Sequence, residues 1–328
     1  ARAGGLMPDR AALPPPPEGL IIDLVTPLTD QGGLDSRGLE RLVARVSPEA
    51  GAILVGSPEA GEALDLSFET RRELLSQALA AVAGRIPLFF CITGDTQEET
   101  AKLAQALLTE SRAQGYPGPL YFADLPLWYH SNRGLPQAYQ RLLAQAPLPL
   151  VVLNQPEVVS RRAPLFKHRH IRTQVFKKLT AIPEIVGLMY RGEMRRFLNY
   201  HYAAVRRPGF AFYEADESNF LTRPGAWGVL SASAQLLPAA WRQVTRTCLH
   251  PEEMVAGQAS RLRLWDLSQG LLEIAKICRS HPAALLKAAL LALGVLSTGA
   301  TAAGTQPAPP AQRDELLALV LPLSRHSR

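Results

Sequence analysis

The chain has 328 residues, 47% of them hydrophobic, which is enough to bury one large core, so we expect a single domain. Its three cysteines, Cys91, Cys248 and Cys278, lie far apart without a CxxC pair, which argues against a disulfide framework or a zinc site and favours a reducing cytoplasm. The net charge of +6 is concentrated in residues 160–179, which contain seven Lys or Arg and no acidic residue; without the aromatic and glycine pattern of a nucleic-acid module, we expect a solvated surface there.

Neither end of the chain predicts secretion or membrane insertion. Residues 1–17 contain arginines without a continuous apolar segment behind them, so we expect residues 1–18 to form a loose arm. The most apolar stretch, residues 282–296, carries Lys287 in its middle and is too short to span a membrane. We therefore expect a packed helix in that stretch and a cytoplasmic protein without membrane association.

Short apolar runs alternate with amphipathic segments along most of the chain. Helical spacing is clear in Leu39, Leu42, Val43 and Val46. Alternating strands and crossover helices predict an α/β fold, a (β/α)8 TIM barrel, whose working site lies at the carboxyl ends of the strands. The expected strands are residues 20–25, 52–55, 88–92, 120–122, 150–153, 185–189, 210–213 and 228–230.

After the eighth strand the pattern is helical only. The segment 297–312 is a linker by composition, and it does not form a phosphate loop because no lysine follows its glycines. We expect a barrel over residues 19–237 and a C-terminal helical extension, residues 238–328, that completes the single domain. The helices expected there are residues 238–248, 252–279, 282–296 and 313–321.

Seven short segments occur in the order found in one known family. They are Leu24 to Pro27, Glu59 to Glu62, Arg85 to Leu88 with Thr93-Gly94, Pro126 to Tyr129, Leu153 to Pro156, Ile185 to Leu188 and Gly228 to Ser231. Together they resemble the dihydrodipicolinate synthase and N-acetylneuraminate lyase family of class I pyruvate aldolases, from about Gly19 to the C-terminus. The resemblance implies a TIM barrel, a small oxo-acid ligand and a homo-oligomer, either a dimer or a tetramer.

The catalytic positions that this resemblance implies hold residues without the family's chemistry. Met189 stands where the family has the lysine that condenses with pyruvate, and Leu153 stands at the tyrosine that relays protons. Glu59 and Ala60 replace two threonines. Because a thioether has no nucleophilic nitrogen, we predict that Schiff-base aldolase activity is lost, and we expect an apolar mouth of the barrel.

The substrate-binding positions that the resemblance implies also differ. Leu127 and Trp128 replace a tyrosine pair, although Tyr129 lies beside them. The arginine expected after Asn-x-Pro is missing, with Glu157 and Val158 in its place. Arg161 and Arg162 could take the place of that arginine only if the loop after Asn-x-Pro is longer here than in the family.

The polar residues that remain near the strand ends are the candidate site. Arg191 is a candidate anion clamp, and Glu59 with Glu62 is a candidate acid and base couple. We nevertheless expect Glu62 to hold loop hydrogen bonds and Glu59 to face water. Asp216 and Glu217 are expected as charges at a helix N-terminus, with the mouth of the barrel as the alternative. The candidate ligand-binding residues are Glu62, Trp128, Tyr129, Tyr190, Arg191 and Ser231.

Other reactive side chains are expected to be structural or exposed. Lys177 and Lys178 precede the sixth strand and should face solvent, and Cys91 should be a core residue. His168 and His170 lie two residues apart on a basic loop and are expected to be a surface pair. We therefore expect no cofactor and no metal ion.

Three functions follow from this sequence. The first is a family member that has lost catalysis and binds a small ligand or a partner. The second is an active lyase that works through Glu59, Glu62 or Tyr129. The third is a structural or regulatory subunit of an active paralogue. Convergent polar groups in the mouth favour an enzyme, whereas an apolar filling favours a subunit.

Overall fold

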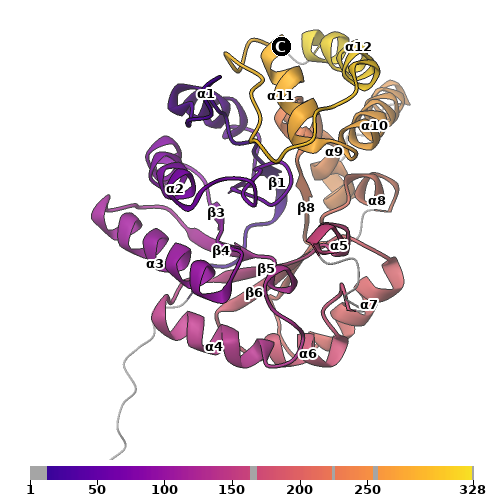
Figure 1. Ribbon diagram of the computed structural model, residues 1–328. Helices are drawn as coiled ribbons and strands as arrows, with labels where there is room; N and C mark the ends of the chain where they lie inside the picture. The colour runs from indigo at the N-terminus through magenta and orange to yellow at the C-terminus, as the bar shows by residue number, and fades with distance from the viewer. Residues whose placement is uncertain (1–12, 163–167, 224–225, 254–257, 327–328) are drawn as a thin grey trace, which may run out of the picture.

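The computed structural model describes residues 13–162, 168–223, 226–253 and 258–326. Eight parallel strands pair in chain order and close a barrel (Figure 1). All eight expected strands are present, with ends that differ by no more than two residues, which confirms the TIM barrel. The strands are β1 (Gly19–Asp23), β2 (Ala52–Val55), β3 (Leu88–Cys91), β4 (Leu120–Asp124), β5 (Leu150–Asn154), β6 (Ile185–Tyr190), β7 (Ala211–Glu214) and β8 (Gly228–Ser231).

Helices between the strands surround the barrel, because each buries one apolar face on the sheet. In the first of them, Leu39, Leu42, Val43 and Val46 are buried as their spacing predicts. These helices are α1 (Ser36–Val46), α2 (Phe68–Val82), α3 (Gln97–Ala113), α4 (Leu135–Gln145), α5 (Pro156–Arg162), α6 (Thr173–Leu179), α7 (Met194–Ala203) and α8 (Glu217–Thr222), with a 3-10 turn η1 (Pro126–Trp128) after β4.

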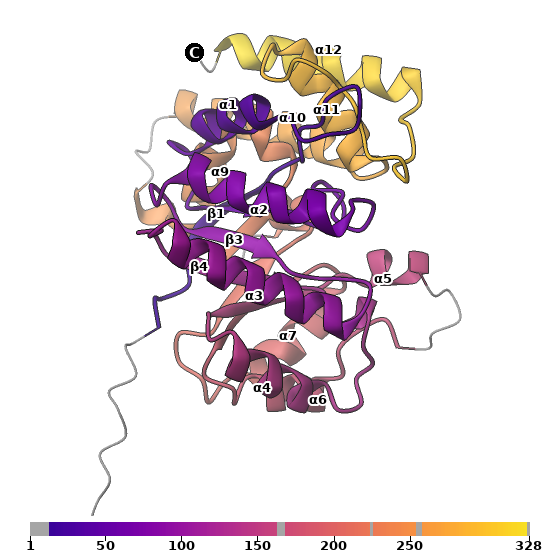
Figure 2. The same ribbon diagram turned by 60° about the vertical axis from the view of Figure 1, so that its left-hand side comes forward.

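The C-terminal extension is helical, as expected. α10 packs against α8 and α9, and α12 packs against α10 and α11, so the last helices lie together beside the barrel (Figure 2). Of the expected helix 252–279, residues 258–278 are helical and residues 252–253 belong to a 3-10 turn, while residues 254–257 lie outside the described residues. Among the described residues, the helices are too short or too polar to cross a membrane. The elements are η2 (Ser233–Gln235), α9 (Pro238–Leu249), η3 (Pro251–Glu253), α10 (Gln258–Cys278), α11 (Pro282–Ala292) and α12 (Pro310–His326).

The segment before β1 is bound to the barrel where the structure describes it. The Tyr121 hydroxyl donates a hydrogen bond to the Pro15 carbonyl, and the Tyr213 hydroxyl donates one to the Pro17 carbonyl, both at 2.6 Å. The expectation of a loose arm over residues 1–18 is therefore wrong for residues 15–17, because two core tyrosines hold them. Residues 1–12 lie outside the described residues.

The end of β6 determines which side chain enters the barrel. The Tyr190 ring contacts Phe197 and Tyr200 of α7, so it lies between the sheet and that helix. Because successive side chains of a strand point to opposite faces, Met189 points into the barrel. Its register partner on β5 is Leu153, and both side chains are fully buried.

Candidate functional site

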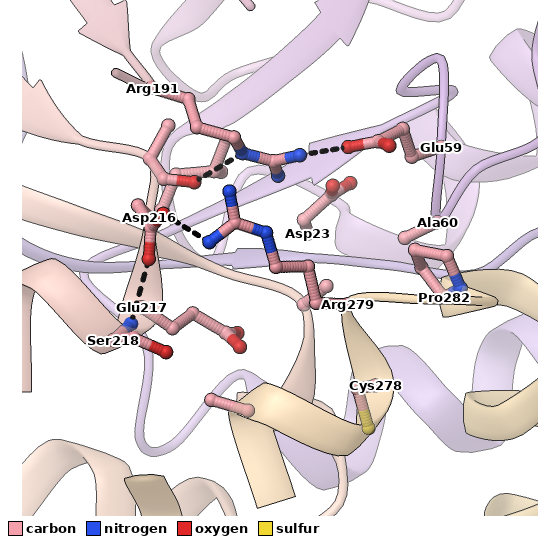
Figure 3. A pocket seen from close by; sticks show the side chains of 14 residues that line it. Asp23, Glu59, Ala60, Arg191, Asp216, Glu217, Ser218, Cys278, Arg279 and Pro282 are labelled. Atoms are coloured by element: carbon pink, nitrogen blue, oxygen red, sulfur yellow. Dashed lines mark hydrogen bonds and ion pairs between the residues drawn. The ribbon is translucent and has the colours of Figure 1, made fainter. Parts of the chain in front are cut away.

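A small cavity lies at the carboxyl ends of the strands, the usual place for a TIM-barrel site (Figure 3). Its volume is about 50 Å³, which is room for a few water molecules. The ends of β1, β6 and β7, the loop after β2 and the end of α10 all contribute to its wall. Its charged lining residues are Asp23, Glu59, Arg191, Asp216, Glu217 and Arg279.

Glu59, in the loop after β2, lies between two arginines. Arg161 of α5 donates to Glu59 Oε1 at 2.6 Å, and Arg191, which follows β6, pairs with Glu59 Oε2. Burial alone raises the pKa of Glu59, but the two guanidinium groups outweigh it and hold the pKa below its usual value. The expectation that Glu59 faces water is wrong: its side chain is only 7% exposed because the arginines hold it in the mouth.

Arg279, directly after α10, joins the C-terminal extension to the mouth. Its guanidinium donates to Asp216 Oδ2 at 2.7 Å and to Glu157 Oε1 at 2.6 Å. Asp216 also caps α8, since its Oδ1 accepts hydrogen bonds from the backbone N–H groups of Ser218 and Asn219. Asp216 therefore has both roles considered from the sequence, the helix cap and the lining of the mouth.

Glu217 is held at the mouth by one group at the end of β8 and one group just after that strand. The Ser231 hydroxyl donates to Glu217 Oε1 at 2.6 Å, and the Ser233 backbone N–H donates to the same oxygen at 2.8 Å. Burial raises the pKa of Glu217 despite these hydrogen bonds. Ser231, a candidate ligand-binding residue, does not line the cavity itself but binds the Glu217 carboxylate that does.

Asp23, the last residue of β1, also lines the cavity, and its buried Oδ1 has no hydrogen-bond partner among the described residues. The residue is 7% exposed, and burial raises the pKa of its carboxyl to about 8, with the charges of Glu59 and Glu217 acting in the same direction. A hydrogen bond from Ser57 and the charge of Arg191 oppose that rise. Burial therefore favours the protonated form of the Asp23 carboxyl.

The apolar pair Met189 and Leu153 lies outside the lining of this cavity. The expectation of an apolar mouth is therefore wrong. The two residues fill the barrel interior, as expected from their side chains, but charged groups from neighbouring positions and from α10 surround the cavity. The site keeps convergent polar groups without an amine at the end of β6.

The Dihydrodipicolinate synthetase family matches residues 16–321 of this sequence. The chain belongs to this family. The 4-hydroxy-tetrahydrodipicolinate synthase of Xylella fastidiosa is 28% identical over 254 residues, which cover 76% of each chain. That of Thiobacillus denitrificans is 30% identical over 228 residues, which cover 67% of this chain and 70% of the relative. The dihydrodipicolinate synthase structure from Bacteroides thetaiotaomicron aligns with a TM-score of 0.77 at 21% identity, over 94% of this chain and 100% of that chain, and supports the fold.

In this dihydrodipicolinate synthetase family member, Glu62 has a structural partner that the sequence analysis missed. Lys287 of α11 is fully buried and pairs with Glu62 Oε2, while its Nζ donates to the Ala300 carbonyl at 2.8 Å. Glu62 Oε1 accepts from the Ala302 N–H at 2.8 Å and from the Thr305 hydroxyl at 2.7 Å. Glu62 holds loop hydrogen bonds, as expected, and does not line the cavity.

The aromatic candidates lie around the site rather than in the cavity wall. The Tyr129 hydroxyl donates to buried Asp124 at 2.7 Å, and burial raises the pKa of Tyr129 well above its usual value. Trp128 donates from Nε1 to Asp95 at 3.0 Å and lies under the Arg162 guanidinium, 5.0 Å from the ring centroid. It lines a groove that adjoins the cavity at Glu59.

Lys177, Lys178 and Cys91 lie as expected, but His170 does not form the expected surface pair with His168, because its ring is half-buried beside Tyr190. Lys177 and Lys178 are exposed on α6. Cys91 is fully buried, and burial raises the pKa of its thiol to about 11. His168 is exposed and interacts with Arg172. Within the described ranges of the chain, no group of three His, Cys, Asp or Glu side chains is placed to hold a metal ion.

Asp23 and Arg279 were not predicted from the sequence. A single carboxylate between Ile22 and Leu24 in an apolar strand is a signal for a buried functional or structural acid. Arg279 gives no such signal, because an arginine after a helix is ordinary and its partners lie far away in the chain. Lys287 does give one, because a lone lysine in an apolar run requires a buried partner.

Proposed function

We propose that this member of the dihydrodipicolinate synthetase family does not form a Schiff base with pyruvate and instead binds a small polar ligand in the charged mouth of its barrel. Buried Met189, at the position where the family resemblance implies the catalytic lysine, is the observation that carries the proposal. A thioether cannot condense with a carbonyl group, so the covalent intermediate cannot form there.

The neighbouring lysines do not replace the missing amine. Lys177 and Lys178 lie on the outer face of α6. Burial lowers the pKa of Lys287, but the charge of Glu62 opposes this shift, and the ammonium group remains paired with that carboxylate. Lys287 is also absent from the wall of the cavity. An active lyase through Glu59 or Tyr129 is not favoured either, since Glu59 is held by two arginines and Tyr129 donates to Asp124.

The size of the expected loss of catalytic rate supports the proposal. General acid and base groups typically contribute about 100-fold to 10,000-fold each to a rate. The relay position holds Leu153, whose side chain carries no proton, so the nucleophile and the relay are lost together. The relatives' names describe a synthase. We propose that this chain shares their barrel and not their chemistry.

Proton exchange of pyruvate tests this proposal. An iminium formed between a lysine and pyruvate makes the methyl group acidic, so the enamine that follows exchanges methyl protons with D2O. We expect the methyl NMR signal of pyruvate to decay at the same rate with and without the protein. Faster decay with the protein would show that an iminium forms.

Assembly is a second role, favoured by one surface. Leu198, Tyr202 and Val205 follow one face of α7 and its end, and their exposed fractions are 59%, 80% and 71%. Exposed apolar groups at such spacing favour contact with another protein surface. We propose that the chain forms a homo-oligomer, a dimer or a tetramer, through this face, and a subunit role is compatible with ligand binding.

A further inference from the structure

The charges around the cavity are unbalanced. Its wall carries four carboxylates, Asp23, Glu59, Asp216 and Glu217, against two guanidinium groups, Arg191 and Arg279. When every group is ionised, the wall therefore has two more negative than positive charges. In the absence of a cation, such a buried excess is relieved by protonation of carboxyl groups.

Of these carboxylates, Asp23 has the least compensation from neighbouring groups. Glu59 and Asp216 pair with arginines, and Glu217 accepts two hydrogen bonds. The carboxyl of Asp23 lines the cavity with an Oδ1 that is buried and has no hydrogen-bond partner (Figure 3). A buried polar atom without a partner costs about 1–3 kcal/mol, so a donor that enters the cavity gains that interaction.

We propose that the mouth of the barrel binds a small primary amine, with its ammonium group against Asp23. The inference rests on the proposed function, because it assigns a ligand class to the same mouth. An ammonium group supplies three donors and one positive charge, which match the unpartnered Oδ1 of Asp23 and the excess of carboxylates. An anion would instead have to displace Glu59 from Arg191 or Asp216 from Arg279.

The size of the site limits the ligand. A volume of about 50 Å³ accommodates an ammonium group and a short carbon chain. A longer tail has room in the adjoining groove, whose wall includes Glu59, Trp128 and Thr305. The ligand class is therefore a short primary amine or a molecule that ends in one.

Binding of the amine should release a proton. The charges of Glu59, Arg191 and Glu217 act on Asp23, and Asp216 and Arg279 line the same cavity. Cys278 of α10 also lines it, but burial keeps the thiol neutral by raising its pKa well above the usual value. Since the pKa of Asp23 is about 8 without a ligand, an ammonium that pairs with the ionised carboxylate must displace its proton at lower pH.

Isothermal titration calorimetry with ethylamine hydrochloride tests the proposal, with sodium acetate as the anionic probe at equal ionic strength. We expect ethylamine to bind with release of one proton near pH 6, seen as a heat that depends on the ionisation enthalpy of the buffer. Its affinity should rise about tenfold per pH unit up to about pH 8. Asp23→Asn should weaken binding about 10-fold to 100-fold, whereas Asp314→Asn, a change at an exposed carboxylate on α12, should not.

Three results would overturn the proposal. They are no ethylamine binding at either about pH 6 or about pH 8, ethylamine binding that Asp23→Asn leaves unchanged, and acetate binding that strengthens as the pH falls. The circular dichroism spectrum of Asp23→Asn shows whether it folds, and the proton release of the unmodified protein decides the question if it does not. Treatment of the protein with pyruvate and borohydride, in a sample without ethylamine, tests the proposed function separately, because a lysine adduct refutes that function whatever the amine titration shows.

Discussion

The ammonium group of Lys287 lies against the carboxylate of Glu62 with both side chains almost completely buried, 0% and 1% exposed. Hydrogen bonds from Ala302 and Thr305 to Glu62, and from Lys287 to Ala300, extend the pair to the segment between α11 and α12. The pair thus joins the loop after β2 to the C-terminal extension. A lysine and a glutamate 225 positions apart in sequence fix how these two parts meet.

Removal of one member of this pair should destabilise the protein strongly. Lys287→Met leaves the Glu62 carboxylate buried without its cation, which typically costs about 3–5 kcal/mol. Urea denaturation measures the free energy of unfolding. Lys276→Met, which removes the exposed partner of Glu273, should change it by less than about 1 kcal/mol. Equal effects of the two substitutions would show that the buried pair contributes no more than a surface pair.

Asp23 should make the protein less stable as the pH rises. Its pKa is about 8 in the folded chain and ordinarily 3.8, so between these values the native state holds a proton that the unfolded state has lost. The free energy of unfolding therefore falls through this window, by up to about 1.4 kcal/mol per pH unit from this group. Asp23→Asn should remove that part of the slope.

Urea denaturation of both proteins at several values between about pH 5 and about pH 8 measures the difference. Glu214, whose pKa burial raises to about 7, contributes a slope of the same sign, but it is present in both proteins and cancels in the comparison. Asp314→Asn, an exposed change, should keep the slope of the unmodified protein. Parallel curves for the unmodified protein and Asp23→Asn would contradict the account of Asp23.

The exposed face of α7 should mediate self-association. A glutamate at position 198 places a charge in the middle of the apolar stripe, so Leu198→Glu should shift a dimer or tetramer to the monomer. Light scattering coupled to size-exclusion chromatography measures the mass. Leu262→Glu is a matched control, because Leu262 is similarly exposed, at 58%, but lies on α10. A monomeric unmodified protein, or an oligomer that Leu198→Glu does not affect, would refute this interface.

The sequence predicted the barrel well because strand periodicity is local. Each expected apolar run of three to six residues overlaps a strand, since parallel strands buried on both faces are continuously apolar. The placement of Met189 and Leu153 near the ends of neighbouring strands was also correct, and their equivalence to the family's lysine and tyrosine stays a prediction. These inferences need no knowledge of which helices meet in space.

Four of the six charged lining residues, Glu59, Arg191, Asp216 and Glu217, were named from the sequence, but their ion pairs were missed because the partners are distant in sequence. Arg279 and Asp216 are 63 residues apart, and Arg191 and Glu59 are 132 apart. An apolar mouth was predicted from the substituted positions Met189 and Leu153 alone. The residues Glu59 and Arg191, however, turn their charges into the cavity. Of the distant groups, Asp23 and Lys287 gave a local signal as single charges in apolar segments.

Borohydride trapping tests the central claim most directly. The protein is incubated with pyruvate, reduced with borohydride and measured by intact-mass spectrometry, with Met189→Lys treated alongside as the variant that restores an amine at the end of β6. The account predicts that the unmodified protein keeps its mass, and an adduct on Met189→Lys alone would show that the barrel still admits pyruvate. A stable pyruvate adduct on a lysine of the unmodified protein would contradict the claim that Schiff-base chemistry is lost.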